Sequence, residues 1–367
     1  MAAAGEESPE PMITTRNGAL KPRLVSVGTA TPPNTYTQQD LLELFACDNP
    51  LVRRFFESSH IRQRHLVLPE PGPDGTLPSE SGEQLIRKHK EWGIRIGREA
   101  IMRCLHAYGA RPADIDYLMV ISSTGFLCPG LASYLVTECG MRANTHRVDM
   151  LGMGCNAGIN GLVPTSQWAA ANPGGVALMV CVEVCSAAYV FDMTVRTGVV
   201  NSLFGDGSAA ALVVADAGHS AADGPQIIDF ECLMIPEARE EMRFDFEAGR
   251  FSFYLGWEVP YLIGEHIATP INRLLARAGL KMRDIKHWVV HSGGKKVVDS
   301  IKYNIGITEH DVRHTRSILK EYGNLSSGSF LFSYQELQRE DAVRPGEWGM
   351  FVTMGPGISI ETALVRW

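Results

Sequence analysis

The sequence predicts an α/β protein built from two related halves. Three observations support this prediction: short apolar runs alternate with longer helical patterns, a set of motifs recurs about 170 residues apart, and the composition is that of a globular chain. The 367 residues are 45% hydrophobic and 20% charged. These values exclude a disordered chain, a collagen-like repeat or a coiled coil as a description of the whole. The length fits two domains or one large duplicated unit.

The elements are expected in a simple order along the chain. Residues 1–22 form a flexible N-terminal segment, and residues 68–81 (LPEPGPDGTLPSES) form a Pro/Gly-rich surface loop. The N-terminal half then spans residues 23–222 and the C-terminal half residues 223–367. Strands buried on both faces are expected at five apolar runs, Tyr117–Ser122, Val176–Val184, Ala209–Ala215, His287–His291 and Met350–Met354.

The duplication itself is indicated by motifs that recur at a nearly constant displacement. The run from Gly109 to Ser122 is echoed from Gly279 to Ser292, 170 residues later, with Gly, Asp-Ile and Ser in matching places. Gly154-Cys155 is echoed by Gly323-Asn324 at a displacement of 169, before a helix. Gly205–Gly207 is echoed by Gly355–Gly357, before a strand. This order of motifs, found twice, predicts two stacked halves in five layers, α/β/α/β/α.

The duplication brings three chemically useful residues together. Cys155 and Asn324 would face each other near the axis that relates the halves, with His291 exposed at a neighbouring strand end. The start of a helix favours a thiolate and an oxyanion, so this arrangement suits acyl transfer. Each residue also has a purely structural interpretation: a buried core cysteine, a hydrogen-bonded core histidine, and an asparagine that caps the helix starting near Leu325. Their combination with the repeat favours the functional interpretation.

Charge, hydropathy and cysteine spacing exclude several classes of binding partner. The 34 basic and 41 acidic residues give a net charge of -7 without a long Lys/Arg run, so a nucleic-acid partner is not expected. No apolar run reaches the roughly 18 residues of a transmembrane helix and no signal-peptide pattern is present, so we expect a cytoplasmic protein without a membrane partner. The eight cysteines include no Cys-x-x-Cys pair, so neither a disulfide framework nor a metal site is expected.

Two nucleotide-binding motifs fail on their details. The glycines at 152, 154 and 158 resemble a dinucleotide loop, but the acidic residue expected about 20 positions further on is missing. The sequence from His291 to Lys295 (HSGGK) lacks the spacing of a phosphate-binding loop. Nucleotide hydrolysis is therefore not expected.

Taken in order, the motifs resemble those of the type III polyketide synthases of the chalcone synthase superfamily, from about Leu24 to Trp367. The matching motifs are GMGCNAG around Cys155, LFGDGSAAA at 203–211, VVHSGG around His291, YGNLSSG around Asn324, and Gly355-Pro356-Gly357. The resemblance implies a duplicated thiolase fold, a homodimer, and catalysis by Cys155, His291 and Asn324 on CoA thioesters, with no metal or redox cofactor. Initiating ketoacyl synthases and hydroxymethylglutaryl-CoA synthases differ from this pattern.

The same resemblance assigns further residues. Phe204 and Phe253 match two phenylalanines that gate the passage between the CoA tunnel and the reaction cavity; their structural alternative is aromatic core packing. The arginines at 53, 54, 62 and 64 correspond to the tunnel mouth, where Arg54 matches a CoA-binding position and Ser58 replaces an expected lysine. A solvated helix face is the alternative for this patch.

Departures from the plant enzymes indicate the substrate. Ala188 stands where those enzymes have a cavity-lining threonine, and Cys128 replaces a methionine of the dimer interface. The GMGCNAG motif and the segment 185–192 (CSAAYVFD) are most similar to the bacterial branch that makes 3,5-dihydroxyphenylacetyl-CoA as an antibiotic precursor. The resemblance therefore implies malonyl-CoA as starter and extender, with helper dehydratase enzymes as candidate partners. Alternatives are a malonyl-CoA-using synthase that makes a pyrone or tetrahydroxynaphthalene, and a non-catalytic scaffold.

Overall fold

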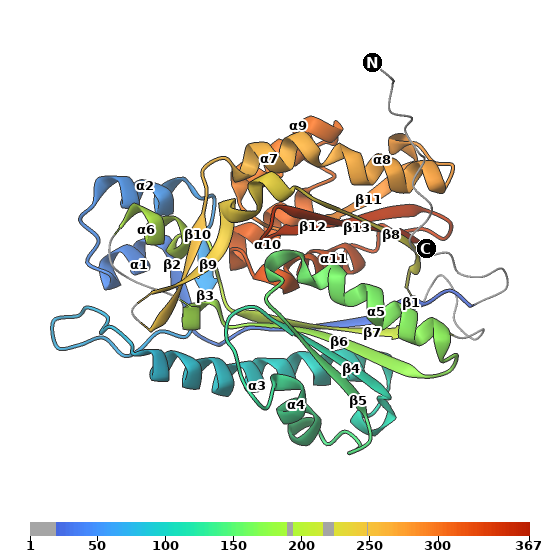
Figure 1. The fold of residues 1–367 in the computed structure, drawn as a ribbon, viewed down its shortest axis with the longest axis horizontal. Coiled ribbons are helices and arrows are strands. Elements are labelled where there is room, and N and C mark those ends of the chain that lie inside the picture. The colour runs from blue at the N-terminus through green and yellow to red at the C-terminus, as the bar shows by residue number, and fades with distance from the viewer. Residues whose placement is uncertain (1–19, 189–193, 216–223, 248) are drawn as a thin grey trace.

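The computed structural model describes residues 20–188, 194–215, 224–247 and 249–367, and it confirms the duplicated α/β architecture. Its main sheet has nine strands in the order β11-β12-β13-β8-β1-β7-β6-β4-β5. Strands β1 and β8 meet at the pair Arg23 and Gln226, and Figure 1 shows the two parts of the sheet as separate layers. The predicted boundary at 222/223 and most of the predicted N-terminal segment lie outside the described residues.

The two parts of the sheet repeat one topology. In the N-terminal part, β4 runs parallel to β6, and β7 is antiparallel to both β6 and β1. In the C-terminal part, β11, β12, β13 and β8 repeat this order and these directions. The five predicted strands are confirmed, with ends shifted by two residues at most. The strands are β1 (Arg23–Ala30), β4 (Tyr117–Ser122), β5 (His146–Leu151), β6 (Val176–Glu183), β7 (Gly207–Val214), β8 (Gln226–Met234), β11 (Ile285–Val290), β12 (Trp348–Gly355) and β13 (Ser359–Arg366).

Helices supply the other three layers (Figure 1). The N-terminal part of the sheet is covered on its outer face by α3 (Gly82–Tyr108) and α4 (Leu131–Cys139). The C-terminal part is covered by α7 (Val259–His266), α8 (Ala268–Arg277) and α9 (Lys295–Ile305). Helices α5 (Ala157–Ala171) and α11 (Ser329–Arg339) lie between the two parts. This is the predicted order α/β/α/β/α.

The central helices fit between two sheets because their contact faces are small. A Cβ atom at Gly158 of α5 would lie 2.4 Å from the ring of Phe330 in α11, and one at Gly161 would lie 2.3 Å from Ile121 of β4. Glycine is therefore needed at both places for the close approach of helix and neighbour. The surrounding core joins residues of α5 and α11 to inward-facing residues of both parts of the sheet. Burial of this shared apolar surface holds the halves together.

The displacement of the repeat is not the same throughout. Near the outer helices it is 170, because the short turns η1 and η6 begin at Pro112 and Met282. In the central layer it is 172, because α5 begins at Ala157 and α11 at Ser329. Cys155 therefore corresponds to Ser327, and the predicted correspondence of Cys155 with Asn324 is wrong by three positions. Strand β11 also ends at Val290, so Ser292 follows the strand.

The remaining elements lie mostly around one end of the sheet. They are β2 (Thr35–Thr37), α1 (Gln38–Leu44), α2 (Pro50–Ser58), β3 (Gln63–His65), η1 (Pro112–Asp114), η2 (Gly154–Asn156), η3 (Cys185–Ala188), α6 (Val195–Asn201), η5 (Pro236–Glu241), β9 (Met242–Glu247), β10 (Arg250–Leu255), η6 (Met282–Asp284), α10 (Arg313–Tyr322) and η7 (Ser326–Gly328). The predicted surface loop at 68–81 contains no helix or strand. Within the described ranges, no helix combines the length and apolar character needed to cross a membrane.

Candidate active site

Cys155 lies on a tight turn between β5 and α5. Gly152 and Gly154 have φ values of 76° and 74°, a region that L side chains rarely adopt. A Cβ atom at Gly154 would lie 2.3 Å from the ring of Pro356. The glycine therefore lets the Gly355–Gly357 loop of the C-terminal half pack directly against the cysteine turn. Cys155 itself lies at the start of the helix, as the motif predicts, and its side chain is buried.

Asn324 reaches the same place from the other half. Its side-chain Oδ1 accepts a hydrogen bond of 2.8 Å from the backbone N–H of Ser326, so the predicted capping role is present in a local form. This bond fixes the amide orientation and leaves the side-chain NH2 free to donate. Burial raises the pKa of the Cys155 thiol, and the side chain of Asn324 is near enough to offset part of this increase. The structure therefore brings Cys155 and Asn324 together.

A buried carboxyl group is connected to Cys155 through a serine hydroxyl. Glu183, at the end of β6, accepts hydrogen bonds from the hydroxyls of Ser326 (3.3 Å) and Ser327 (2.5 Å). The backbone N–H of Ser123 also donates to it at 3.0 Å. The sulfur of Cys155 lies 3.6 Å from the hydroxyl oxygen of Ser326, so the cysteine, serine and glutamate form a chain. Burial raises the pKa of Glu183 to about 7 despite these donors.

His291 follows β11 at the edge of the sheet, but its side chain is 2% exposed. The prediction of an exposed histidine is therefore wrong, because the Gly-Gly turn after it folds over the ring: a Cβ atom at Gly293 would lie 3.2 Å from the imidazole. The backbone N–H of His291 donates to Val352 at 2.9 Å. The next residue, Ser292, donates its hydroxyl to the carbonyl of Gly323 at 3.3 Å, which ties His291 to the segment of Asn324.

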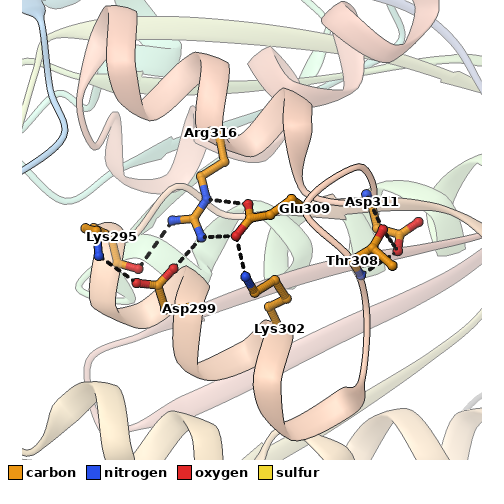
Figure 2. A network of polar contacts seen from close by, with 7 residues as sticks. All are labelled: Lys295, Asp299, Lys302, Thr308, Glu309, Asp311 and Arg316. Atoms are coloured by element: carbon orange, nitrogen blue, oxygen red, sulfur yellow. Dashed lines mark hydrogen bonds and ion pairs between the residues drawn. The ribbon is translucent and has the colours of Figure 1, made fainter.

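An ion-pair network fixes the helices next to these two residues. Helix α9 begins just after His291 and α10 ends just before Asn324. Figure 2 shows Arg316 of α10 between Asp299 of α9 and Glu309, with Lys295 and Lys302 completing the network. Such a network is stronger than an isolated surface pair. It links α9 to α10, the helices next to His291 and Asn324.

The resting cysteine and histidine are both neutral in this environment. Burial, together with a smaller effect of the carboxyl of Glu183, raises the pKa of the Cys155 thiol to about 12 against the lowering effects of Ser326 and Asn324. Burial lowers the pKa of His291 to about 3. Desolvation therefore favours the neutral thiol over the thiolate that the start of a helix favours. His291 Nδ1 has no hydrogen-bond partner among the described residues.

The two predicted gates meet at the wall of a small cavity. The rings of Phe204 and Phe253 are 5.7 Å apart and nearly perpendicular, an edge-to-face contact. The space in this cavity that is open to the centres of water-sized molecules is about 30 Å³. Both gates and Cys155 line it, as do Ala188 and a third aromatic residue, Phe244 of β9. Phe244 packs 4.8 Å from Phe253 and carries the aromatic wall toward the surface.

The arginines near the expected tunnel mouth divide into two kinds. Arg54 is exposed on α2, where its carbonyl accepts a bond of 2.6 Å from the hydroxyl of Ser58. Arg62 is exposed and paired with Glu321. Arg64, in contrast, is fully buried, so its inclusion in a phosphate-binding patch is wrong. Its guanidinium instead donates to backbone carbonyls next to the gate.

Two positions that depart from the plant enzymes are partly described. Ala188 lines the cavity, as expected for its motif. Cys128 is exposed on the segment between β4 and α4. Of the predicted segment 185–192, residues 189–192 lie outside the described part of the chain.

Comparison with known proteins decides the family. Residues 12–217 match the N-terminal domain of the chalcone and stilbene synthases, and residues 230–367 match their C-terminal domain. The chain belongs to the chalcone and stilbene synthase family. This confirms the resemblance to type III polyketide synthases.

Relatives of this synthase are similar over nearly their whole length. It is 48% identical to the 3,5-dihydroxyphenylacetyl-CoA synthase of Streptomyces toyocaensis over 352 residues, which cover 95% of the chain and 90% of the relative. It is 46% identical to the synthase of the same name from Amycolatopsis orientalis, covering 94% and 93%. The crystal structure of 1,3,6,8-tetrahydroxynaphthalene synthase from Streptomyces coelicolor A3(2), a bacterial type III polyketide synthase, superposes with a TM-score of 0.86 at 29% identity, covering 94% and 99%.

Sequence reasoning missed two residues of the synthase that line or support the cavity. Phe244 lies in a run of alternating aromatic and charged residues (MRFDFE), a pattern that predicts a strand without saying which ring faces the cavity. Glu183 ends an apolar strand, where a single carboxyl within VALMVCVEV is the one available signal. Its partners at 123, 326 and 327 are far away in the sequence, so their convergence appears only in the fold.

Proposed function

We propose that the synthase condenses malonyl-CoA units on Cys155 and releases 3,5-dihydroxyphenylacetyl-CoA, an antibiotic precursor. The observation that carries this proposal is the likeness to two synthases of that name over at least 94% of the chain. The likeness to the tetrahydroxynaphthalene synthase structure is weaker, at 29% identity. A cytoplasmic location, where CoA thioesters are used, fits the proposal.

The loading step follows from the neutral resting state. The imidazole of His291 takes the proton of the Cys155 thiol as the sulfur attacks the thioester carbonyl of malonyl-CoA. The bond from that carbonyl to the CoA sulfur breaks, and the CoA thiolate leaves with the proton from the imidazolium. The acyl group is then held on Cys155 as a thioester. Because the thiol pKa is about 12, base assistance is needed at neutral pH.

The condensation step needs donors for a developing negative charge. When malonyl-CoA loses CO2, the electron pair of the broken carbon–carbon bond moves onto the thioester as an enolate. The amide of Asn324 and the ring N–H of His291 then donate to the enolate oxygen. The enolate carbon attacks the acyl group on Cys155 and releases the cysteine thiolate, which yields a chain longer by two carbons. A neutral imidazole, favoured by the low pKa of His291, retains one N–H for this role.

Cyclisation gives the proposed product if the chain stops at eight carbons. Four malonyl units supply this tetraketide once each of them, including the starter on Cys155, has lost its carboxyl group as CO2. Attack of the C8 carbon on the C3 carbonyl, with loss of water, then leaves the thioester outside the ring. The aromatic wall of Phe204, Phe253 and Phe244 keeps water from the reactive chain. Dehydratase enzymes of the same pathway would complete the loss of water. The CoA thioesters are substrates, and these steps use no metal or redox cofactor.

Incubation with malonyl-CoA alone, followed by mass spectrometry, tests the proposal. The expected product is 3,5-dihydroxyphenylacetyl-CoA or its hydrated precursor. Products limited to pyrones or tetrahydroxynaphthalene would favour the alternative malonyl-CoA-using synthase. Turnover only with an aromatic or long-chain starter would show that the starter assignment is wrong. A failure to load acyl groups under any condition would favour a non-catalytic scaffold.

We also propose that the synthase is a homodimer that pairs through β5. This strand is at the edge of the sheet and its side chains are largely exposed. Exposed apolar residues Val148, Leu151 and Phe126 lie on or near this edge. An unprotected apolar edge is a site for pairing with another chain. Light scattering of the wild type and of Val148→Arg tests this: we expect a dimer that the variant weakens, and a monomeric wild type would refute it.

Arg54 remains the proposed contact for CoA phosphates. Its exposure on α2 leaves the guanidinium available to an anionic ligand. Arg54→Met should raise the KM for malonyl-CoA about 5- to 10-fold with little change in kcat, as expected for loss of one charge-assisted contact. The exposed Arg111→Met, far along the chain, serves as the control.

A further inference from the structure

We infer that Arg64 is a positioning residue that holds the gate Phe204 and the oxyanion donor Asn324 in register. The inference rests on the proposed function, because it concerns residues assigned to that reaction. It gives a role to a charged side chain that the mechanism does not use.

The guanidinium head is bound to the gate segment. Arg64 lies on β3 and is fully buried. Its Nη1 donates to the backbone carbonyls of Asn201 and Phe204, both at 2.7 Å. A buried charge is tolerated only where its donors are satisfied, and the planar fork of arginine can serve several acceptors at once. The carbonyl of Phe204 is therefore held by a charge-assisted bond.

The aliphatic part of the Arg64 side chain, its stem, contacts the segment that carries Asn324. Gly323, which precedes Asn324, has a φ of +73°. A Cβ atom at Gly323 would lie 2.8 Å from Arg64 Cδ and 2.6 Å from the carbonyl oxygen of Leu203. The missing side chain thus lets the backbone before Asn324 pack on the arginine stem. Head and stem of one residue contact the two segments that carry Phe204 and Asn324.

Gln38 contacts both Arg64 and the segment that carries the gate. Its Oε1 accepts from Arg64 Nη2 at 2.8 Å, and its Nε2 donates to the carbonyl of Ser202 at 2.8 Å. The same Nε2 lies 2.8 Å from the hydroxyl of Ser59. Residues 201, 202 and 204 are therefore held by Arg64 and Gln38 together. Loss of either partner should loosen the gate rather than a distant part of the fold.

The test compares Arg64→Lys with Gln38→Met and with Arg62→Lys as a matched control. A lysine keeps the charge, but its single ammonium group cannot donate at once to the carbonyls of Asn201 and Phe204 and to the side chain of Gln38. Alkylation of Cys155 is measured by mass spectrometry with N-phenylmaleimide and with iodoacetamide. A loosened gate should raise the rate ratio of the bulky to the small reagent at least about 5-fold in Arg64→Lys and about 2-fold in Gln38→Met. Arg62 is exposed and bonded to Glu321, so its variant should leave the ratio unchanged.

A second readout follows the reaction itself. In Arg64→Lys, the fraction of decarboxylated malonyl-CoA that enters carbon–carbon bonds should fall about 5-fold or more, because gate and oxyanion donor no longer share one register. A structural role alone would lower thermal stability without changing either ratio per folded molecule. Folded Arg64→Lys with both ratios within 2-fold of wild type would overturn the inference.

Two further outcomes are decisive. If the wild type makes no product from malonyl-CoA, the proposed function fails, and the alkylation ratio alone decides the role of Arg64. If Arg64→Lys does not fold, Gln38→Met decides: an unchanged alkylation ratio in that variant, or its failure to fold as well, overturns the inference. A raised ratio in Gln38→Met supports it.

Discussion

The backbones of Phe204 and Asn324 are joined as a short parallel bridge. The N–H of Asn324 donates to the carbonyl of Leu203 at 2.8 Å, and the N–H of Gly205 donates to the carbonyl of Asn324 at 3.0 Å. A residue proposed to gate the cavity and a residue proposed to stabilise the enolate therefore cannot move independently. Displacement of one moves the other, so variants at either position should affect both chain entry and chemistry.

Cys155→Ala should abolish covalent acyl loading while the protein stays folded, because Cys155 is the proposed nucleophile and lines the cavity. The check is intact-protein mass spectrometry after incubation with malonyl-CoA. Cys104→Ala is a matched control, since burial also raises the pKa of that thiol to about 12 but it does not line the cavity. Loading that survives in Cys155→Ala would exclude Cys155 as the nucleophile.

Alkylation by iodoacetamide should label the exposed Cys128 and Cys232 first and Cys155 next, ahead of Cys181 and Cys185. Only the thiolate reacts, so the rate at Cys155 should rise with pH through pH 9, without a plateau near pH 7. Peptide mapping over time measures the order. A plateau near neutral pH would indicate a preformed ion pair with His291.

His291→Ala and Asn324→Ala should each slow decarboxylation of malonyl-CoA by roughly 10² or more, because each removes a donor to the developing enolate oxygen. Release of labelled CO2 provides the measurement. Asn304→Ala, at an exposed position of α9, is the control and should leave the rate unchanged. Normal decarboxylation in both site variants would remove these residues from the reaction.

Glu183 should make the protein less stable as pH rises from about 4.5 to 7. Its pKa in the folded protein is about 7, above its ordinary value of 4.5, so the folded state binds the extra proton in this window. The contribution is fully present below pH 4.5 and is lost as pH rises through 7; it amounts to about 3 kcal/mol.

Urea unfolding of wild type and Glu183→Gln at pH 5 and pH 8 checks this expectation. The variant should lose less stability than the wild type between the two pH values. The titration of His291 changes the stability of both proteins equally. Its effect therefore cancels when the stability change of the variant is compared with that of the wild type. Glu99→Gln, which affects an exposed ion pair with Arg103, should behave as the wild type. An identical pH dependence in Glu183→Gln would contradict the prediction.

Phe244→Ala should enlarge the cavity and admit bulkier acyl-CoA starters, because the removed ring lines the cavity and packs on Phe253. The ring is partly exposed, so the expected loss of stability is about 1–2 kcal/mol, below that of a fully buried phenylalanine. Competition between malonyl-CoA and longer acyl-CoA starters measures the effect. Phe246→Ala, on the same strand and 67% exposed, should not change the preference.

The sequence was sufficient for the fold because the fold rests on local patterns. Apolar runs such as Tyr117–Ser122 fill strands buried on both faces, and that periodicity survives in a single sequence. The repeat revealed the two halves even though its displacement changes from 170 to 172. Cys155 was found because glycines in its motif mark a tight turn, a local property of the chain.

The environment of the site could not be predicted in the same way. Burial of His291 depends on β11, β12 and the turn at Gly293 packing together, and charge states depend on that burial. Arg64 looked like part of a basic patch because its neighbours in sequence are exposed arginines. The backbone carbonyls that accept from it belong to residues more than a hundred positions away, so only the folded chain shows that it binds the backbone.

The offset of 172 in the central layer has a consequence for ancestry. Cys155 aligns with Ser327, and Asn324 aligns with Gly152. Neither copy of the repeat therefore carries both the nucleophile and the oxyanion donor. A precursor of half this length could have assembled such a set only by pairing two chains. In the present chain the reacting groups meet only when both halves have folded against each other, so either half alone would lack the site.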